Sequence, residues 1–263
     1  MPLVTSGGVR ISYDVVGEGR PLMLLHGLWC DRSWWTEPGY VDVLRSDHRL
    51  VNVDIRGHGT SDKPHDPAAY SGDTLVGDVL AVADAEGLDR FAIWGHSYGG
   101  WIAWMTAAAA PERVPAIVTT GEWDPRPVSD WSGMEEFNDA LRRGGTRALV
   151  ELFKVIDGGD HDREFPFWAR AVTLRSDPEA LLAAGAPALV PEGILDKELR
   201  SFPVPALLIA GELDDVDDVA AKVASLIPHG ESLRLPGLGH GGSCIASALT
   251  MPTARAFLDR WFP

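Results

Sequence analysis

The stretch Phe91-Ala92-Ile93-Trp94-Gly95-His96-Ser97-Tyr98-Gly99-Gly100 decides the fold of this chain. Its apolar first half predicts a strand that ends at Trp94, and a helical pattern begins at Ser97. Gly95, Ser97 and Gly99 form the pattern Gly-x-Ser-x-Gly, in which small flanking residues permit a tight strand–turn–helix connection. Such a connection lifts the serine above the sheet, at a helix N-terminus where developing negative charge is favoured. Ser97 is therefore the candidate nucleophile.

Short apolar and β-branched runs alternate with helical patterns on both sides of this stretch, which predicts a mostly parallel sheet flanked by helices. Leu3–Thr5 and Val9–Val16 predict an initial hairpin. The other predicted strands are Leu22–Leu25, Leu50–Ile55, Phe91–Trp94, Ala116–Thr119, Ala206–Ile209 and Ser232–Leu235. The predicted helices are Thr74–Glu86, Ser97–Ala110, Val216–Leu226 and Thr253–Trp261. The fold class is thus α/β, with eight strands.

The segment 125–202 interrupts this alternation, because it contains no convincing strand. Helical patterns cover Met134–Arg143, Arg147–Ile156 and Phe165–Arg175, separated by glycines and prolines. We interpret residues 1–124 and 203–263 as an α/β core, and residues 125–202 as a helical lid inserted after the sixth strand.

Composition excludes several classes of function. The chain has 263 residues and a formal net charge of −15, which argues against nucleic-acid binding because phosphates would be repelled. It shows no secretory signal and no apolar run near the ~20 residues of a membrane span. Its two cysteines cannot form a disulfide framework. We therefore expect a cytoplasmic protein that binds neither nucleic acid nor membrane.

Motifs for common cofactors are also missing. The sequence contains no Walker loop, no Gly-x-Gly-x-x-Gly after a strand and no His-Glu-x-x-His. We expect no cofactor and no catalytic metal.

Over nearly its whole length the chain resembles the α/β-hydrolases. The matching motifs are Leu24-Leu25-His26-Gly27, Asp54-Ile55-Arg56-Gly57-His58-Gly59-Thr60-Ser61-Asp62, the turn at Ser97, Gly211-Glu212-Leu213-Asp214 and Leu235-Pro236-Gly237-Leu238-Gly239-His240. They follow the order of the family. The resemblance implies a catalytic triad in which a histidine activates the serine and a carboxylate orients the histidine.

His240 is the predicted base, since it lies in a glycine-rich loop after the last strand, where the family places its catalytic histidine. By the same resemblance His26 and His58 are structural, and His96 is expected to point away from the site. The remaining histidines lie in polar surroundings that indicate the protein surface; they are His48, His65, His161 and His229.

Asp214 is the predicted acid, because it follows Gly211 at the end of an apolar strand and matches the family's usual position. Some family members take the acid from the end of the sixth strand instead. Glu122 is therefore the alternative acid, with Asp124 beside it. The order Ser97, Asp214, His240 agrees with the order of the fold.

By resemblance, the oxyanion hole uses the backbone N–H groups of Leu28 and Tyr98. Aromatic residues also gather in segments expected to face the site, namely Trp29, Trp123, Trp131, Phe165, Phe167 and Trp168. Trp29, Trp123 and Trp168 are the predicted substrate contacts, although packing of the lid against the sheet explains such residues equally well.

The segment Phe165–Arg170 is similar to the lid of zearalenone-type lactonases, which open large resorcylic macrolactones. Those enzymes also use a glutamate like Glu122, but they lack the Gly211–Asp214 pattern, so the similarity is partial.

These observations predict a cofactor-independent serine hydrolase that cleaves a carboxylic ester or lactone of a mainly apolar small molecule. C–C bond hydrolases and perhydrolases use the same triad and are the alternatives. Hydroxynitrile lyases are disfavoured because no basic residue is a candidate for the pocket. Epoxide hydrolases and haloalkane dehalogenases are disfavoured because they need an aspartate at the position of Ser97. A non-catalytic receptor for a small ligand is the alternative from another class.

Overall fold

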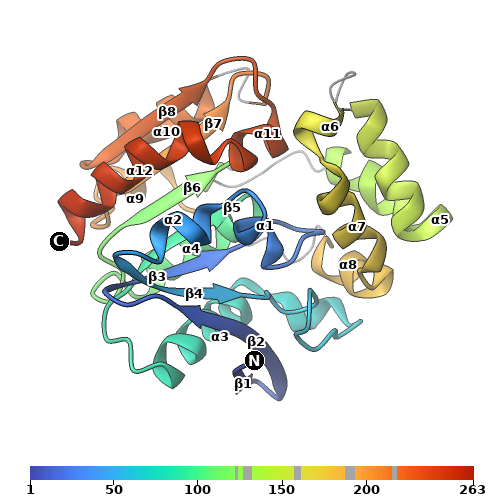
Figure 1. The fold of residues 1–263 in the computed structure, drawn as a ribbon, viewed down its shortest axis with the longest axis horizontal. Helices are drawn as coiled ribbons and strands as arrows, with labels where there is room; N and C mark the ends of the chain where they lie inside the picture. Colours follow the sequence, from blue (N-terminus) through green and yellow to red (C-terminus); the bar gives the residue numbers. More distant parts are fainter. Residues whose placement is uncertain (122–123, 127–131, 157–160, 187–192, 215–217) are drawn as a thin grey trace.

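The computed structural model describes residues 1–121, 124–126, 132–156, 161–186, 193–214 and 218–263. An eight-stranded sheet in the order β1-β2-β4-β3-β5-β6-β7-β8 forms the centre of the molecule (Figure 1). Its strands are β1 Leu3–Ser6, β2 Val9–Val16, β3 Arg20–Leu25, β4 His48–Val53, β5 Ala92–His96, β6 Ile117–Thr120, β7 Ala206–Gly211 and β8 Gly230–Leu235.

The pairing of the strands confirms the predicted mostly parallel sheet. β1 pairs antiparallel with β2, and β2 antiparallel with β4. All pairs from β4 to β8 are parallel. The carboxyl ends of β3 to β8 therefore meet at one edge of the sheet, where sites in open α/β folds are found.

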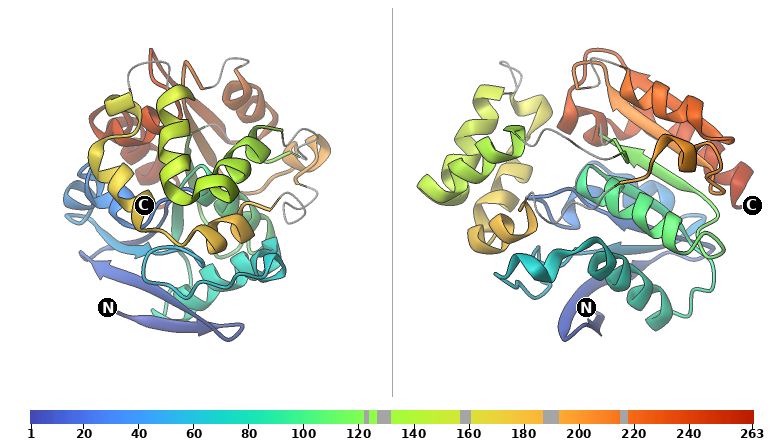
Figure 2. Two further views of the ribbon diagram at one scale, coloured as in Figure 1. Left: turned by 90° about the vertical axis from the view of Figure 1, so that its right-hand side faces the viewer. Right: turned by 180° about the vertical axis from the view of Figure 1, so that it is seen from behind.

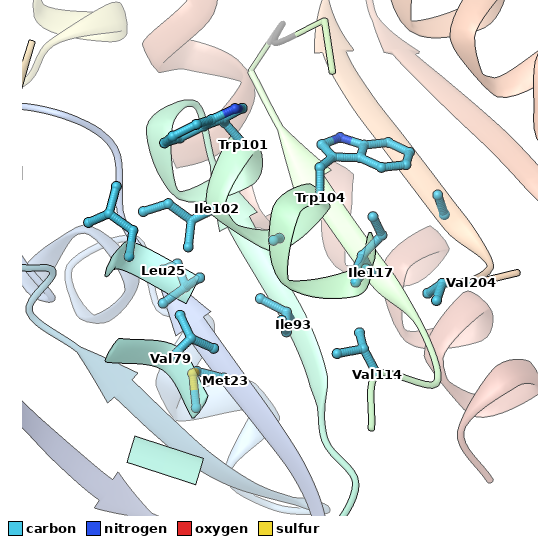
Figure 3. Close-up of a cluster of buried hydrophobic side chains, with 14 of the residues drawn as sticks. Met23, Leu25, Val79, Ile93, Trp101, Ile102, Trp104, Val114, Ile117 and Val204 are labelled. Atoms are coloured by element: carbon cyan, nitrogen blue, oxygen red, sulfur yellow. The ribbon is translucent and has the colours of Figure 1, made fainter. Parts of the chain in front are cut away.

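Both faces of the sheet are covered. Successive strand residues point to opposite sides, and both sets of side chains are buried. In β3, Met23 and Leu25 face one buried cluster, whereas Leu22 and Leu24 face another. Figure 3 shows part of the first cluster, in which Met23, Leu25 and strand residue Ile93 lie near aromatic and aliphatic side chains of the covering helices. This two-sided burial explains why the strands are continuous apolar runs in sequence.

The helices divide between the two faces. α3 (Gly72–Ala85), α4 (Tyr98–Ala109) and α10 (Val219–Leu226) pack in the first cluster. α1 (Ser33–Thr36), α2 (Tyr40–Leu44) and α12 (Ser247–Trp261) pack in the second. Within the described residues, no helix is long and apolar enough to cross a membrane.

The helices differ from the prediction in two ways, in the start of α12 and in the presence of short helices that were not predicted. α12 begins at Ser247 rather than Thr253, because Pro252 reads as a helix breaker but the buried residues Thr250 and Met251 hold the preceding turn against the core. The short elements escaped the sequence analysis since they contain too few turns for periodicity. Besides α1 and α2 they are η1 (Pro67–Tyr70), α6 (His161–Glu164), α8 (Pro178–Ala184), α9 (Asp196–Leu199) and α11 (His240–Ile245).

Four helices between β6 and β7 lie at the edge toward which the arrows of β3 and β4 point (Figure 1), and Figure 2 shows them grouped together from two further directions. They are α5 (Ser132–Ile156), α6 (His161–Glu164), α7 (Phe167–Arg175) and α8. The helix α9 also lies between β6 and β7 in sequence, but it stands apart from this group, and its residue Leu199 is buried in the first cluster. The two predicted helices within 134–156 form one range, which is interrupted at Gly144 and Gly145 by non-helical backbone. The predicted helical segments are therefore present, next to the carboxyl ends of the strands.

The prediction that His48 lies at the surface is wrong. Its side chain is buried, and Nδ1 lies 3.2 Å from a carboxylate oxygen of Asp47. The polar neighbours in sequence misled the prediction, because His48 opens strand β4 and its ring packs inward. His229 is exposed, as predicted, and His65 lies at the surface between Asp177 and Glu179.

His26 and His58 are buried and hydrogen-bonded to the backbone, as the resemblance implied. Nδ1 of His58 donates to the carbonyl of Arg56 at 2.8 Å, and its ring lies edge-on to that of His26 at 5.2 Å. Burial, together with the nearby His26, lowers the pKa of His58 from 6.5 to about 3. His58 is therefore neutral in the folded protein at neutral pH.

Because unfolding restores an ordinary pKa to His58, we expect stability to depend on pH between about 6.5 and 3. In that window the unfolded chain takes up a proton that the folded chain rejects, so the free energy of unfolding falls as pH falls, by up to about 1.4 kcal/mol per pH unit for this one group. Above pH 6.5 the contribution is complete and constant. Urea unfolding at pH 7, 6 and 5 measures the slope.

His58→Asn keeps a donor toward the Arg56 carbonyl but removes the titrating ring, so its slope should be shallower than that of the wild type. His229→Asn, at an exposed histidine, is the control and should leave the slope unchanged. Equal slopes for wild type and His58→Asn would contradict the assignment.

Candidate active site

Ser97 occupies the turn between β5 and α4 with a strained backbone, at φ 50° and ψ −114°. Two glycines make this turn possible because a Cβ at Gly95 would lie 2.2 Å from the carbonyl oxygen of Gly99, and a Cβ at Gly99 would lie 2.2 Å from that of Leu25. A strained serine between a strand and a helix, with glycine two residues away on each side, is the geometry expected of a nucleophile elbow.

His240 and Asp214 are joined by a hydrogen bond of 2.8 Å between Nδ1 and Oδ2. Asp214 follows β7 and His240 follows β8, and the two loops are tied by the Leu213 amide, which donates to the Leu238 carbonyl at 2.9 Å. Because a carboxylate accepts at Nδ1, the neutral imidazole carries its proton there and Nε2 is an acceptor. The structure thus brings the predicted base and the predicted acid into contact.

His96 does not point away from the site, so that prediction is wrong. Its ring centroid lies 5.2 Å from that of His240, and its other neighbour, Trp34, stacks on it at 5.1 Å with an interplanar angle of 18°. Nδ1 of His96 donates to the Thr120 carbonyl at 2.9 Å, and burial lowers the pKa of His96 well below its ordinary value. The ring of His96 is therefore neutral at neutral pH, and its hydrogen bond and its stacking on Trp34 hold it next to His240.

Two further glycines show how closely the loops meet. A Cβ at Gly27 would lie 3.5 Å from Cβ of Ser97 and 2.9 Å from the His96 ring. A Cβ at Gly121 would lie 2.9 Å from the same ring and 3.1 Å from Cε1 of His240. The segments after β3, β5, β6 and β8 therefore converge around His96.

The two amides predicted for the oxyanion hole lie in this region. Tyr98 is the first residue of α4, where backbone N–H groups have no intrahelical acceptor. Leu28 follows Gly27, which lies against Ser97, and the next residue, Trp29, has a left-handed backbone with φ 67°. The side chain of Tyr98 is itself buried, so any role of this residue toward a substrate belongs to its backbone.

Aromatic residues of the segment after β3 contact those of the helices after β6. Trp29 contacts Phe137 and Phe153 of α5 at centroid distances of 4.6 and 5.3 Å. Trp168 of α7 lies edge-on to Trp34 at 5.3 Å. Trp34, which the sequence analysis did not select, therefore connects the helices after β6 to His96; only its place shortly after the Leu28 loop could have indicated it.

The outcome differs among the other aromatic residues of the prediction. Phe165 is buried against Phe153 at 4.6 Å, whereas Phe167 is 77% exposed. Trp123, Trp131 and the alternative acid Glu122 lie outside the described residues. Asp124, the neighbour of Glu122, forms an ion pair of 2.6 Å with Arg126.

A strained serine at a strand–helix turn and a hydrogen-bonded His–Asp pair after β7 and β8 are the groups that a serine hydrolase combines. The chain belongs to the α/β-hydrolase fold family, since the sequence model of that family, described as alpha/beta hydrolase fold, matches residues 20–243.

Curated relatives include enzymes of two kinds. A pimeloyl-[acyl-carrier protein] methyl ester esterase of Nitrosomonas europaea is 31% identical over 243 residues, which cover 88% of this chain and 92% of the relative. Epoxide hydrolase 4 of Mus musculus is 34% identical over 117 residues, covering 44% of this chain and 32% of the relative. The match thus spans about a third of the length of the epoxide hydrolase.

Solved structures share the fold over nearly the whole chain. The enol-lactonase from Burkholderia xenovorans LB400 has a TM-score of 0.84 and 24% identity, with 98% of this chain and 100% of that chain covered. Est816, described as an N-acyl homoserine lactone degrading enzyme, has a TM-score of 0.80 and 25% identity, with 97% and 100% covered.

Proposed function

We propose that the chain is a serine hydrolase that cleaves a carboxylic ester or lactone without a cofactor. The observation that carries the proposal is the Nδ1–Oδ2 hydrogen bond between His240 and Asp214, with the His240 ring 5.2 Å from that of His96, the residue before the strained Ser97. A carboxylate that fixes the histidine tautomer is what a serine nucleophile needs, because an isolated hydroxyl is weakly nucleophilic.

In this mechanism Oγ of Ser97 attacks the substrate carbonyl while Nε2 of His240 takes the hydroxyl proton. The amides of Leu28 and Tyr98 donate to the oxyanion of the tetrahedral intermediate. The imidazolium, stabilised by Asp214, then gives its proton to the leaving alkoxide, and an acyl-enzyme remains. Water, deprotonated by His240, attacks the acyl carbonyl in the same way, which releases the carboxylic acid and restores Ser97.

The aromatic contacts between the segment after β3 and the helices after β6 support the proposal that the substrate is apolar. Trp29, Trp34 and Trp168 gather at the carboxyl edge of the sheet and connect the segment 125–202 to the site. We propose that this segment acts as a lid over an apolar acyl or alcohol group, as pockets for small molecules are lined chiefly by such side chains.

The epoxide-hydrolase relatives do not change the proposal, because Ser97 stands where an aspartate is needed for that reaction. A serine that opened an epoxide would form an ether with the substrate. An ether has no carbonyl carbon for water to attack, so the covalent intermediate could not be hydrolysed as an acyl-enzyme is.

The experiment that tests the proposal is a hydrolysis screen together with labelling by a fluorophosphonate probe. The screen covers p-nitrophenyl esters of increasing acyl length, small and macrocyclic lactones, and one vinylogous diketone. We expect turnover of esters or lactones and labelling of the wild type. Turnover of the diketone alone would favour C–C bond hydrolysis, and a folded protein that neither turns over nor labels would favour the small-ligand receptor.

A further inference from the structure

Glu164, at the end of α6, is a buried carboxylate that the mechanism above does not use. It is 8% exposed, and both of its oxygens accept hydrogen bonds from backbone amides. Oε1 accepts from Gly239 at 2.9 Å and Oε2 accepts from Gly242 at 2.6 Å. These two amides lie on either side of His240, the base of the proposed triad.

The loop fits closely around Glu164. A Cβ at Gly241 would lie 2.0 Å from the carbonyl oxygen of Glu164, and a Cβ at Gly242 would lie 2.5 Å from its Oε1. Glycine at these positions therefore lets the chain around His240 approach the carboxylate. Arg163 adds a third contact, because its Nη2 donates to the carbonyl of Gly237 at 2.7 Å. Figure 1 shows α6 beside α11, which begins at His240.

We propose that Glu164 is a positioning residue that fixes the backbone on both sides of His240 and thereby orients its imidazole between Asp214 and Ser97. The inference rests on the proposed function. Two charge-assisted hydrogen bonds that one buried carboxylate accepts restrain the segment 239–242 more firmly than neutral bonds would. The Asp214 bond holds Nδ1 of the ring, and the two bonds to Glu164 restrain the backbone from which the ring projects.

This role matters to the rate because proton transfer requires close geometry. A displacement of about 1 Å in a catalytic group can reduce the rate by about 100-fold, and loss of a hydrogen-bond partner that orients a metal ligand typically costs 10- to 100-fold in metal sites, which sets the scale expected here. Since Glu164 belongs to the segment after β6, the proposed lid and the proposed base are mechanically linked through this carboxylate.

The test compares Glu164→Gln and Glu164→Ala with the matched control Asp162→Asn. Asp162 is a carboxylate of the same helix, but its side chain is 84% exposed and pairs with Arg170 at 2.7 Å. Glu164→Gln keeps the side-chain length while placing an amide group against one N–H, and Glu164→Ala removes both acceptors. Circular dichroism and Tm establish that each variant is folded at the assay temperature.

We expect kcat and the rate of fluorophosphonate labelling of Ser97 to fall about 10-fold in Glu164→Gln and up to about 100-fold in Glu164→Ala, with KM nearly unchanged. Asp162→Asn should behave as the wild type. A purely stabilising role would lower Tm without slowing the labelling of folded protein. Wild-type labelling and kcat in both folded Glu164 variants would overturn the proposal, as would an equal loss in Asp162→Asn.

A further readout separates this inference from the proposed function. Hydrogen exchange at the Gly239 and Gly242 amides and the NMR signals of the His240 imidazole report positioning without any turnover. If the wild type neither labels nor hydrolyses, the proposed function fails. Faster exchange and altered imidazole signals in Glu164→Gln, but not in Asp162→Asn, would still support the positioning role, and unchanged signals would overturn it.

Discussion

We expect Ser97→Ala to lower kcat on the best ester or lactone substrate by about 10⁶-fold, the size of effect seen when a serine nucleophile is removed from an intact triad. The loss follows because no acyl-enzyme can form without Oγ, while the neighbouring backbone amides and the aromatic residues proposed to bind the substrate remain. The fold should be unaffected, since alanine occupies the strained turn with a smaller side chain. Initial rates with purified variant and wild type, on the same substrate series, measure the effect.

The covalent probe supplies an independent check of the same prediction. The wild type should be labelled at Ser97, which peptide mass spectrometry can locate, and Ser97→Ala should not be labelled at all. A circular dichroism spectrum and a Tm close to the wild-type values are the controls for folding. Retained turnover in a folded Ser97→Ala variant would reject the mechanism, whichever substrate is used.

The second large effect concerns the acid. Asp214→Asn should lower kcat by about 10⁴-fold, because an amide can donate to Nδ1 and thereby stabilise the wrong histidine tautomer, with the proton on Nε2. The replacement has nearly the same size, and Asp214 is 17% exposed, so the loop should keep its shape. Steady-state kinetics should show the loss in kcat with little change in KM.

Glu122→Gln is the matched comparison, since Glu122 is the alternative acid at the end of the sixth strand. The larger of the two losses identifies the carboxylate that orients His240. A small effect of Asp214→Asn together with a large effect of Glu122→Gln would transfer the role to Glu122 and bring the chain closer to the zearalenone-type lactonases. The hydrogen bond of 2.8 Å between His240 and Asp214 favours the first outcome.

The sequence was sufficient for the architecture because the sheet is buried on both faces. A strand covered on both sides must be apolar along its whole length, so runs such as 22–25 and 206–209 are visible without any structure. The turn at Ser97 was equally visible. A Cβ at Gly95 or Gly99 would lie 2.2 Å from a backbone oxygen, so only glycine fits at these two positions. Local sterics and burial leave a clear signal in one sequence.

The sequence also named Asp214 and His240, but their hydrogen bond spans 26 residues and depends on how the loops after β7 and β8 are joined. It failed for His48, because polar neighbours in sequence do not report whether a side chain is buried. It also failed for His96, because a place directly before Ser97 does not fix which way the ring turns in a packed core. These outcomes separate residue type, which the sequence supplies, from side-chain direction, which packing supplies.

The contacts made by the segment after β6 are visible only in the tertiary structure. Trp168 reaches His96 through Trp34, and Glu164 reaches amides 75 and 78 residues away on both sides of His240. No periodicity or motif marks a glutamate for this role, because its partners are backbone groups that every residue carries. The sheet, the turn at Ser97 and the candidate nucleophile can be predicted from the sequence, whereas the position of His240, the proposed base, depends on long-range packing.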